Sequence, residues 1–355
     1  MTESLRFNLP QADLDHVVQS VGNRWQTLAG QTWLLTGGTG FIGKWLLASF
    51  LHANQTRSLQ SQVLVLTRNP DAFCRQHPEL ALNPTVQLVA GDVRSFELPS
   101  GLRVAHVIHA ATDVVAAATP SQIFDTCVQG TRQVLAQMQR SGTQRMLLLS
   151  SGAVYGATPP ELECIPEDWL GAPSSVLPSS AYGEGKRASE LLCAMAAAEH
   201  GFCIPVARCF AFVGPYLPLD KHFAIGNFIG AALRNQTVQI QGDGTACRSY
   251  LYAADLALWL WVLLFDGQSL RTYNVGGGES SSIAELARRV VSVLGASSPV
   301  HIAKQAAPGA PVHRYLPDIQ RITHELELPE ALSLDEAIRR TAQWYQARAD
   351  FFDIF

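Results

Sequence analysis

The sequence has little charge, few lysines and no apolar segment long enough to cross a membrane. Charged residues make up 16% of the 355 residues, only four residues are lysine, and the net charge is −4. Because no basic run occurs, nucleic acid is not an expected partner. The longest apolar stretch, residues 253–265, is shorter than the ~20 residues of a membrane span and contains Asp255, so we interpret it as a buried helix.

The cysteines and the N-terminal segment also exclude several classes. The seven cysteines include no C-x-x-C pair, which argues against a zinc site, and their odd number in a large chain favours reduced thiols. The first thirty residues contain Glu3, Asp13 and Asp15 without an uninterrupted apolar core, unlike a signal peptide or membrane anchor. We therefore expect a cytoplasmic protein without a metal and without a membrane partner.

Short apolar runs alternate with helical patterns over the first two thirds of the chain. Hydrophobic residues make up 47% of the sequence, enough for a large core. The runs are WLLTG, QVLVLTR, VQLVAGD, VAHVIHAA, RMLLLSS and IPVARCF. They lack strict polar alternation, which is typical of parallel strands buried on both faces. The pattern predicts an α/β fold with a doubly wound parallel sheet.

The same pattern divides the chain into three parts. Residues 1–30 have apolar positions at helical spacing and are predicted to be an N-terminal helical extension, an appended surface helix. Residues 31–210 form the predicted sheet domain. Residues 211–355 are predicted to form mainly a smaller substrate-binding lobe, with residues 250–276 returning to the sheet.

Three glycines at a fixed spacing separate the first run from the helical pattern that follows. They are Gly37, Gly40 and Gly43, in the segment TGGTGFIGKW. Gly37 permits a sharp turn, Gly40 lets a backbone approach pyrophosphate oxygens, and Gly43 lets the helix pack closely on the strand. The helix N-terminus adds free N–H groups. The pattern predicts a dinucleotide-binding turn, and a glycine-rich turn without a ligand is the alternative.

The ends of the next two strands indicate which dinucleotide binds. The second strand ends in Thr67 and Arg68 without a carboxylate for a ribose hydroxyl, and a guanidinium suits a 2′-phosphate. NADP(H) is therefore preferred, and NAD(H) is the alternative if Arg68 only stacks on the adenine. Asp92, after the third strand, is expected to accept a hydrogen bond from the adenine amino group, or alternatively to cap the next turn.

A serine, a tyrosine and a lysine form the candidate catalytic group. Tyr182 and Lys186 are four residues apart, so on a helix they share one face. A neighbouring ammonium favours the phenolate and lowers the pKa of the tyrosine, which makes Tyr182 a candidate general acid/base. Ser151, at the end of the fifth strand, is a candidate donor to charge developing on a substrate oxygen. An ordinary surface pair of tyrosine and lysine is the alternative.

Together these motifs resemble the extended short-chain dehydrogenase/reductase family. The segments ARCFAFVGPYLP, NFIGAALRN and QGDGTACRSYLYAADLA are similar to its nucleotide-sugar epimerase/dehydratase branch, and the resemblance runs from about residue 31 to 295. It implies a Rossmann sheet, a nucleotide-diphosphate sugar as substrate and a homodimer formed through the helix from Ile123 and the helix of Tyr182. It also implies that Tyr182 exchanges a proton with the sugar, Ser151 bonds the same sugar oxygen and Lys186 holds the nicotinamide ribose.

The resemblance further implies two sets of binding residues. The expected cofactor contacts are Gly37, Gly40, Phe41, Ile42, Gly43, Arg68, Asp92, Val93, Ala110, Ala111, Thr112, Tyr182 and Lys186. The expected substrate contacts are Ser151, Asn227 and Arg248, the last two on the diphosphate.

Departures from the family pattern narrow the expected reaction. Dehydratases and decarboxylases of this branch carry acidic residues where this chain has Gly152 and Ala153, and 3,5-epimerising relatives carry a cysteine in the same region. Without them, we expect hydride transfer alone at sugar C4, as in a 4-ketoreductase or 4-epimerase. A reductase of a small carbonyl compound without a nucleotide and a non-catalytic NAD(P)-binding regulator are the alternatives.

Overall fold

A computed structural model of the chain describes residues 7–112, 118–221 and 223–348. Seven parallel strands form its central sheet, in the order β11-β6-β5-β4-β1-β2-β3. They are β1 (Thr32–Thr36), β2 (Gln62–Thr67), β3 (Val86–Ala90), β4 (His106–His109), β5 (Arg145–Ser151), β6 (Val206–Cys209) and β11 (Thr272–Val275). The predicted α/β fold with a doubly wound parallel sheet is confirmed.

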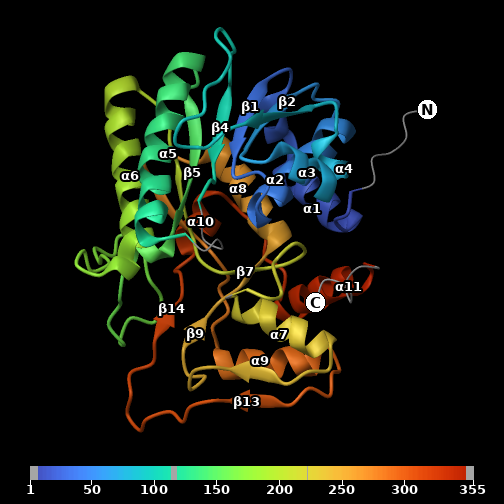
Figure 1. Cartoon of the computed structure of the whole chain (residues 1–355), viewed down its shortest axis with the longest axis vertical. Coiled ribbons are helices and arrows are strands. Elements are labelled where there is room, and N and C mark those ends of the chain that lie inside the picture. Colours follow the sequence, from blue (N-terminus) through green and yellow to red (C-terminus); the bar gives the residue numbers. More distant parts are fainter. Residues whose placement is uncertain (1–6, 113–117, 222, 349–355) are drawn as a thin grey trace.

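Helices cover both faces of this sheet, which explains why its strands are apolar on both sides (Figure 1). Leu34 and Leu35 are neighbours on β1, yet they belong to two separate cores. One core lies under the paired helices α5 (Pro120–Ser141) and α6 (Ala181–His200). The other lies under α2 (Phe41–Thr56), α8 (Ala253–Asp266) and α1 (Gln11–Val21), and includes side chains of α3 (Pro70–Gln76) and α4 (Pro78–Ala81).

The N-terminal helix is part of the core, so the expectation of an appended surface helix is wrong. Leu14, Val17 and Val21 on α1 are fully buried, and the helix packs against α2 and α8. The physical reason lies in α8, which is buried from Ala253 to Leu264 and therefore needs cover on the side away from the sheet. The 3₁₀ helix η1 (Gly22–Leu28) continues this cover.

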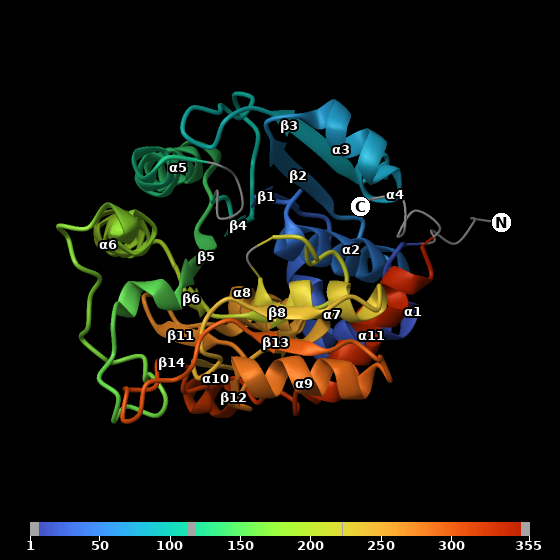
Figure 2. The same ribbon diagram turned by 60° about the horizontal axis from the view of Figure 1, so that its bottom comes forward.

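The C-terminal part of the chain builds a second lobe below the carboxyl ends of the strands (Figure 2). Its helices are α7 (Ala224–Leu233), α9 (Ile283–Val293) and α11 (Leu334–Gln346), whereas α10 (Gln320–Glu325) packs beside β11 of the central sheet. Its strands are β7 (Phe212–Val213), β8 (Val238–Ile240), β9 (Cys247–Arg248), β10 (Leu251–Tyr252), β12 (Ser281–Ser282), β13 (Val300–Ile302) and β14 (Arg314–Tyr315). These strands form small sheets, of which β12-β9-β14 borders the site described below.

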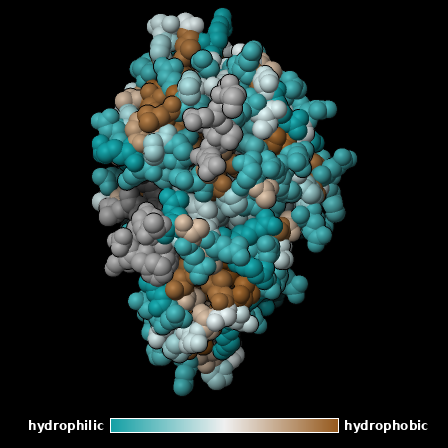
Figure 3. All heavy atoms as spheres, turned by 90° about the vertical axis from the view of Figure 1, so that its right-hand side faces the viewer, coloured by the Kyte–Doolittle hydropathy of each residue, from teal (hydrophilic) through white to brown (hydrophobic). Residues whose placement is uncertain are grey.

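Most apolar side chains are turned inward. The face seen from the right-hand side of Figure 1 is largely hydrophilic, with hydrophobic side chains gathered in smaller patches (Figure 3). No helix in the described part of the chain combines the length and the apolar character needed to cross a membrane.

Candidate active site

A cavity of about 870 Å³ lies where the strands of the central sheet end and the second lobe begins. Parallel α/β sheets bind their ligands at this edge. All of the predicted cofactor-contact residues line the cavity: Gly37, Gly40, Phe41, Ile42, Gly43, Arg68, Asp92, Val93, Ala110, Ala111, Thr112, Tyr182 and Lys186. The structure therefore brings together residues that are widely separated in the sequence, and their contact with a cofactor stays a prediction.

The glycine turn has the geometry expected from its spacing. Gly37 has φ +74°, and a Cβ there would lie 2.7 Å from the carbonyl carbon and oxygen of Ala110. A Cβ at Gly43 would lie 2.3 Å from the Gly37 oxygen, so only glycine lets α2 pack this close to the turn. At the N-cap, Gly40 brings no side chain to the first N–H groups of α2, which leaves them available for an anion.

Arg68 and Asp92 mark one end of the cavity, after β2 and β3. The Asp92 carboxylate accepts hydrogen bonds from the Arg94 backbone N–H at 2.9 Å and from the Arg94 guanidinium at 2.9 and 2.8 Å. These bonds hold the pKa of Asp92 low, at about 2. Asp92 therefore caps the turn, the role expected if it does not bind the adenine amino group. Its carboxylate also presents a negative charge to the cavity at neutral pH.

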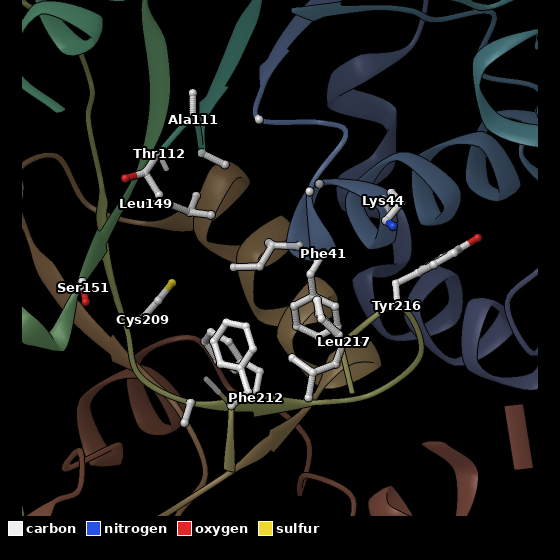
Figure 4. A pocket seen from close by; sticks show the side chains of 18 of the residues that line it. Phe41, Lys44, Ala111, Thr112, Leu149, Ser151, Cys209, Phe212, Tyr216 and Leu217 are labelled. Atoms are coloured by element: carbon white, nitrogen blue, oxygen red, sulfur yellow. The ribbon is translucent and has the colours of Figure 1, made fainter. Parts of the chain in front are cut away.

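Ser151, Tyr182 and Lys186 meet at another part of the cavity wall, where Figure 4 labels Ser151. The helix α6 begins at Ala181, so Tyr182 lies in its first turn and Lys186 one turn later. The Ser151 hydroxyl lies near the Tyr182 hydroxyl, whose pKa it influences, and accepts from the Ala153 N–H at 3.1 Å. The Lys186 ammonium donates to the Leu149 carbonyl at 2.8 Å and lies 6.0 Å from the centre of the Tyr182 ring.

The pKa of Tyr182 differs in direction from the sequence-based expectation. Burial is the largest cause and raises the pKa of Tyr182 above its usual range, while the neighbouring Ser151 hydroxyl acts in the opposite direction. The Lys186 ammonium, expected to lower the pKa of Tyr182, is itself buried with a lowered pKa and donates to the Leu149 carbonyl. The phenol is therefore neutral near pH 7 and suited to donate a proton.

Of the two predicted diphosphate contacts, the structure brings one to the cavity. Arg248 on β9 lines the cavity, and its guanidinium carbon lies 5.5 Å from the centre of the Tyr315 ring. Asn227 lies on the exposed face of α7 and is not among the lining residues, although Ala224 and Ile225 of the same helix are. The apolar side of α7 faces the protein, which turns Asn227 outward.

Sequence reasoning missed Tyr315, which also lines the cavity. Its hydroxyl lies near Ser151, and burial raises the pKa of Tyr315. Tyr315 reaches the site because β14 pairs in parallel with β9, with Tyr315 directly opposite Arg248. Because β14 is two residues long and far from β9 in the sequence, no periodic pattern of apolar residues predicts this strand or its pairing.

Among the described lining residues, Asp92 is the one carboxylate, and it lies beyond β3 rather than beside Tyr182. The main chain at Gly152 is approached by the Tyr315 hydroxyl and the Phe210 ring, which occupy the space a side chain would take. Aromatic and hydroxyl groups thus surround the catalytic candidates.

The family model described as the NAD dependent epimerase/dehydratase family matches residues 33–276. The chain belongs to this family. The resemblance to the extended short-chain dehydrogenase/reductases, drawn from the glycine turn, Ser151, Tyr182 and Lys186, is thereby confirmed, and the chain is an enzyme of that type.

The relatives differ in their reactions. UDP-glucuronic acid decarboxylase 3 of Arabidopsis thaliana is 28% identical over 305 residues, which are 86% of each chain. A dTDP-glucose 4,6-dehydratase of Streptomyces niveus is 27% identical, over 88% of this chain and 92% of its own length. NAD-dependent modification of the substrate is therefore common to the family, but these two relatives catalyse different reactions.

Solved structures support the same fold. UDP-glucose 4-epimerase of Thermotoga maritima superposes with a TM-score of 0.74 at 20% identity, over 89% of this chain and 98% of its own. A dTDP-glucose 4,6-dehydratase double mutant of Streptomyces venezuelae with NAD bound gives a TM-score of 0.74 at 26% identity, over 91% and 99%. The Rossmann-like arrangement of sheet and flanking helices is thus shared.

Proposed function

We propose that this enzyme transfers hydride reversibly at C4 of a nucleotide-diphosphate sugar, using a nicotinamide dinucleotide. The observation that carries the proposal is the convergence of the glycine turn, the neighbouring hydroxyls of Ser151 and Tyr182, and Arg248 on the walls of one cavity. The turn suits a pyrophosphate, the hydroxyl pair suits a sugar oxygen, and the guanidinium suits a diphosphate.

The protein's own groups move the proton and hold the substrate. A bound nicotinamide supplies or takes hydride. The neutral phenol of Tyr182 donates a proton to the C4 oxygen in the reducing direction and regains it in the oxidising direction. Ser151 stabilises charge on the same oxygen, and Lys186 supports the wall through the Leu149 carbonyl.

The absence of a second acid near Tyr182 favours hydride transfer over elimination or loss of carboxylate. Water elimination needs a group that delivers a proton to the leaving hydroxyl, and Gly152 and Ala153 have no such group. Asp92, the one carboxylate among the described lining residues, lies after β3 and away from Tyr182. This sets the chain apart from the decarboxylases and the dehydratase that it resembles in sequence. A 4-ketoreductase and a 4-epimerase both fit this chemistry.

For the cofactor we propose NAD(H) or NADP(H), because one observation favours NAD(H) and another favours NADP(H). Several solved structures of the same fold contain NAD, including the dehydratase at 26% identity. Arg68 at the end of β2 still favours a 2′-phosphate. Denaturing the purified protein and identifying any released dinucleotide by mass spectrometry decides between them.

The experiment that tests the reaction uses the full chain with UDP-, dTDP-, CDP- and GDP-sugars in both the hydroxyl and 4-keto forms, with NADH and NADPH. The products are followed by mass and by proton nuclear magnetic resonance. An unchanged mass with an inverted C4 indicates an epimerase, and a gain of two hydrogens with oxidised cofactor indicates a ketoreductase. Loss of CO₂ or of water overturns the proposal.

A homodimer is proposed through the outer face of α5 and α6. Phe124 on α5 and Leu191 and Met195 on α6 are exposed large apolar side chains, and Leu191 is 62% exposed. Such side chains on two adjacent helices favour burial against a second copy. Light scattering coupled to gel filtration is expected to give twice the chain mass, and L191E/M195E is expected to give the monomer.

A further inference from the structure

Lys44 is a cavity-lining cation that neither the sequence motifs nor the proposed chemistry uses. It lies in the first turn of α2, directly after Gly43, and lines the cavity. Its ammonium lies 4.2 Å from the centre of the Tyr216 ring and 3.3 Å from Nε2 of His77. Figure 4 shows Lys44 and Tyr216 beside each other, on the side of the cavity away from Ser151.

This position is unfavourable for a positive charge in two separate ways. The N-terminus of a helix carries the positive end of its dipole, which repels a cation in the first turn. Burial also removes water from the ammonium, and it lowers the pKa of Lys44 to about 8, with nearby Arg348 acting in the same direction. Within the described residues no carboxylate forms an ion pair with Lys44, and Glu79 favours the charged form only from a longer distance.

An anion in the cavity would remove both penalties. Lys44 directly follows Gly43, so its backbone lies within one helical turn of the N–H groups at the start of α2, and its side chain lines the same cavity as the glycine turn. A phosphate group there would accept from both, as phosphates commonly do at helix N-termini.

The aromatic neighbour of Lys44 is held firmly in place. Tyr216 has φ +72°, a left-handed conformation that a tyrosine seldom adopts, and its hydroxyl donates to Glu79 at 3.2 Å. The ring of Trp344 from α11 packs against Tyr216 edge-on, with centroids 4.9 Å apart. The Trp45 indole also donates to the Pro215 carbonyl at 2.9 Å. A fixed aromatic face therefore holds the ammonium at the edge of the cavity.

We propose that Lys44 binds a phosphate group of the dinucleotide, as a contact additional to the glycine turn and Arg68. The inference rests on the proposed function, since it takes a nicotinamide dinucleotide as the ligand. Two phosphates have the required chemistry: the pyrophosphate, which NAD and NADP share, and the 2′-phosphate, which NADP alone carries. Tyr216 is a positioning residue for Lys44.

Calorimetric titration of the cofactor-free protein with NAD and with NADP tests this contact. Removal of a charge-assisted bond in Lys44→Met is expected to weaken binding about ten- to hundredfold. An equal loss for both ligands identifies the pyrophosphate, and a loss for NADP alone identifies the 2′-phosphate. Lys44→Arg is expected to retain most of the affinity. The control is Lys304→Met, which removes an exposed lysine that does not line the cavity.

A second measurement keeps the test independent of how well the variants fold. When the wild type is titrated at pH 8.5 in two buffers of different ionisation enthalpy, binding is expected to take up protons, because an anion raises the pKa of the Lys44 ammonium. No proton uptake, or Lys44→Met binding both dinucleotides within twofold of wild type, overturns the proposal. If the wild type binds neither dinucleotide, the proposed function fails instead.

Discussion

The Tyr315 hydroxyl lies where a side chain on residue 152 would be, because a Cβ built on Gly152 comes within 2.5 Å of it. The same Cβ would lie 2.8 Å from the Phe210 ring. A carboxylate side chain at residue 152 and the Tyr315 hydroxyl would therefore compete for the same space. A phenol from the second lobe occupies the space next to Ser151.

Gly152→Ala is expected to displace Tyr315 and Phe210 and to destabilise the protein by about 1–3 kcal/mol, as overpacking does. Turnover should also fall, by more than the loss of folded protein explains, because Tyr315 lies beside Ser151 in the cavity. Chemical unfolding and turnover of the same preparations measure both. The matched control is Gly242→Ala, whose Cβ meets nothing within 4 Å. Equal behaviour of the two variants would contradict the arrangement.

Tyr182→Phe is expected to reduce turnover by about 10²–10⁴-fold, the usual contribution of a general acid/base. Dinucleotide affinity should change little, since the phenol acts on the substrate oxygen. Tyr273→Phe serves as the control, because Tyr273 is a fully buried tyrosine of β11 outside the cavity. Unaltered turnover in Tyr182→Phe would contradict the assignment of Tyr182 as the general acid/base.

Dinucleotide affinity is expected to fall as the pH rises through about 8, the pKa of Lys44 in the free protein. Below this pH the ammonium is charged and attracts phosphate, and above it the neutral amine does not. The groups that face Lys44 are His77, Glu79, Tyr216 and Arg348. Isothermal titration from pH 6.5 to 9.5 measures the change, which Lys44→Met should abolish. A flat profile in the wild type would argue against the assignment.

Arg340→Met is expected to lower the free energy of unfolding by about 1–3 kcal/mol, because it leaves a buried carboxylate with one partner fewer. Asp13 is 1% exposed and accepts from Arg340 at 2.5 Å and from Tyr252 at 2.6 Å. Arg339→Met is the neighbouring control, since its ion pair with Glu336 is exposed and contributes little. Urea unfolding followed by circular dichroism compares the two, and equal midpoints would refute the expectation.

Local patterns were sufficient for the sheet and the glycine turn. The apolar runs correspond to strands because a parallel sheet covered on both faces requires them, and Gly37 and Gly43 occupy positions that exclude a Cβ. The outward position of Asn227 also follows from a local pattern, because its neighbours Ile225 and Phe228 belong to the buried stripe of α7.

Other features depend on contacts between distant segments, which periodicity does not reveal. The meeting of Arg248 and Tyr315 requires the pairing of β9 with β14. The raised pKa of Tyr182 follows from burial, and burial is a property of the assembled cavity rather than of the Tyr-x-x-x-Lys spacing. The contribution of α1 to the core similarly depends on the packing of its apolar stripe against α8.

The bond between Asp13 and Arg340 joins residues 327 positions apart. During synthesis from the N-terminus, α1 is made early, and Asp13 can bond Arg340 only after the 327 residues up to Arg340 have been added. Nearby, the Trp344 indole donates to the Asn8 carbonyl and the Tyr345 hydroxyl donates to the Leu217 carbonyl at 2.5 Å, so α11 also holds the loop that carries the cavity-lining Leu217. A ribosome that stops before α11 therefore releases a chain in which α1 lacks its charge partner and the loop at Leu217 lacks its bond from Tyr345.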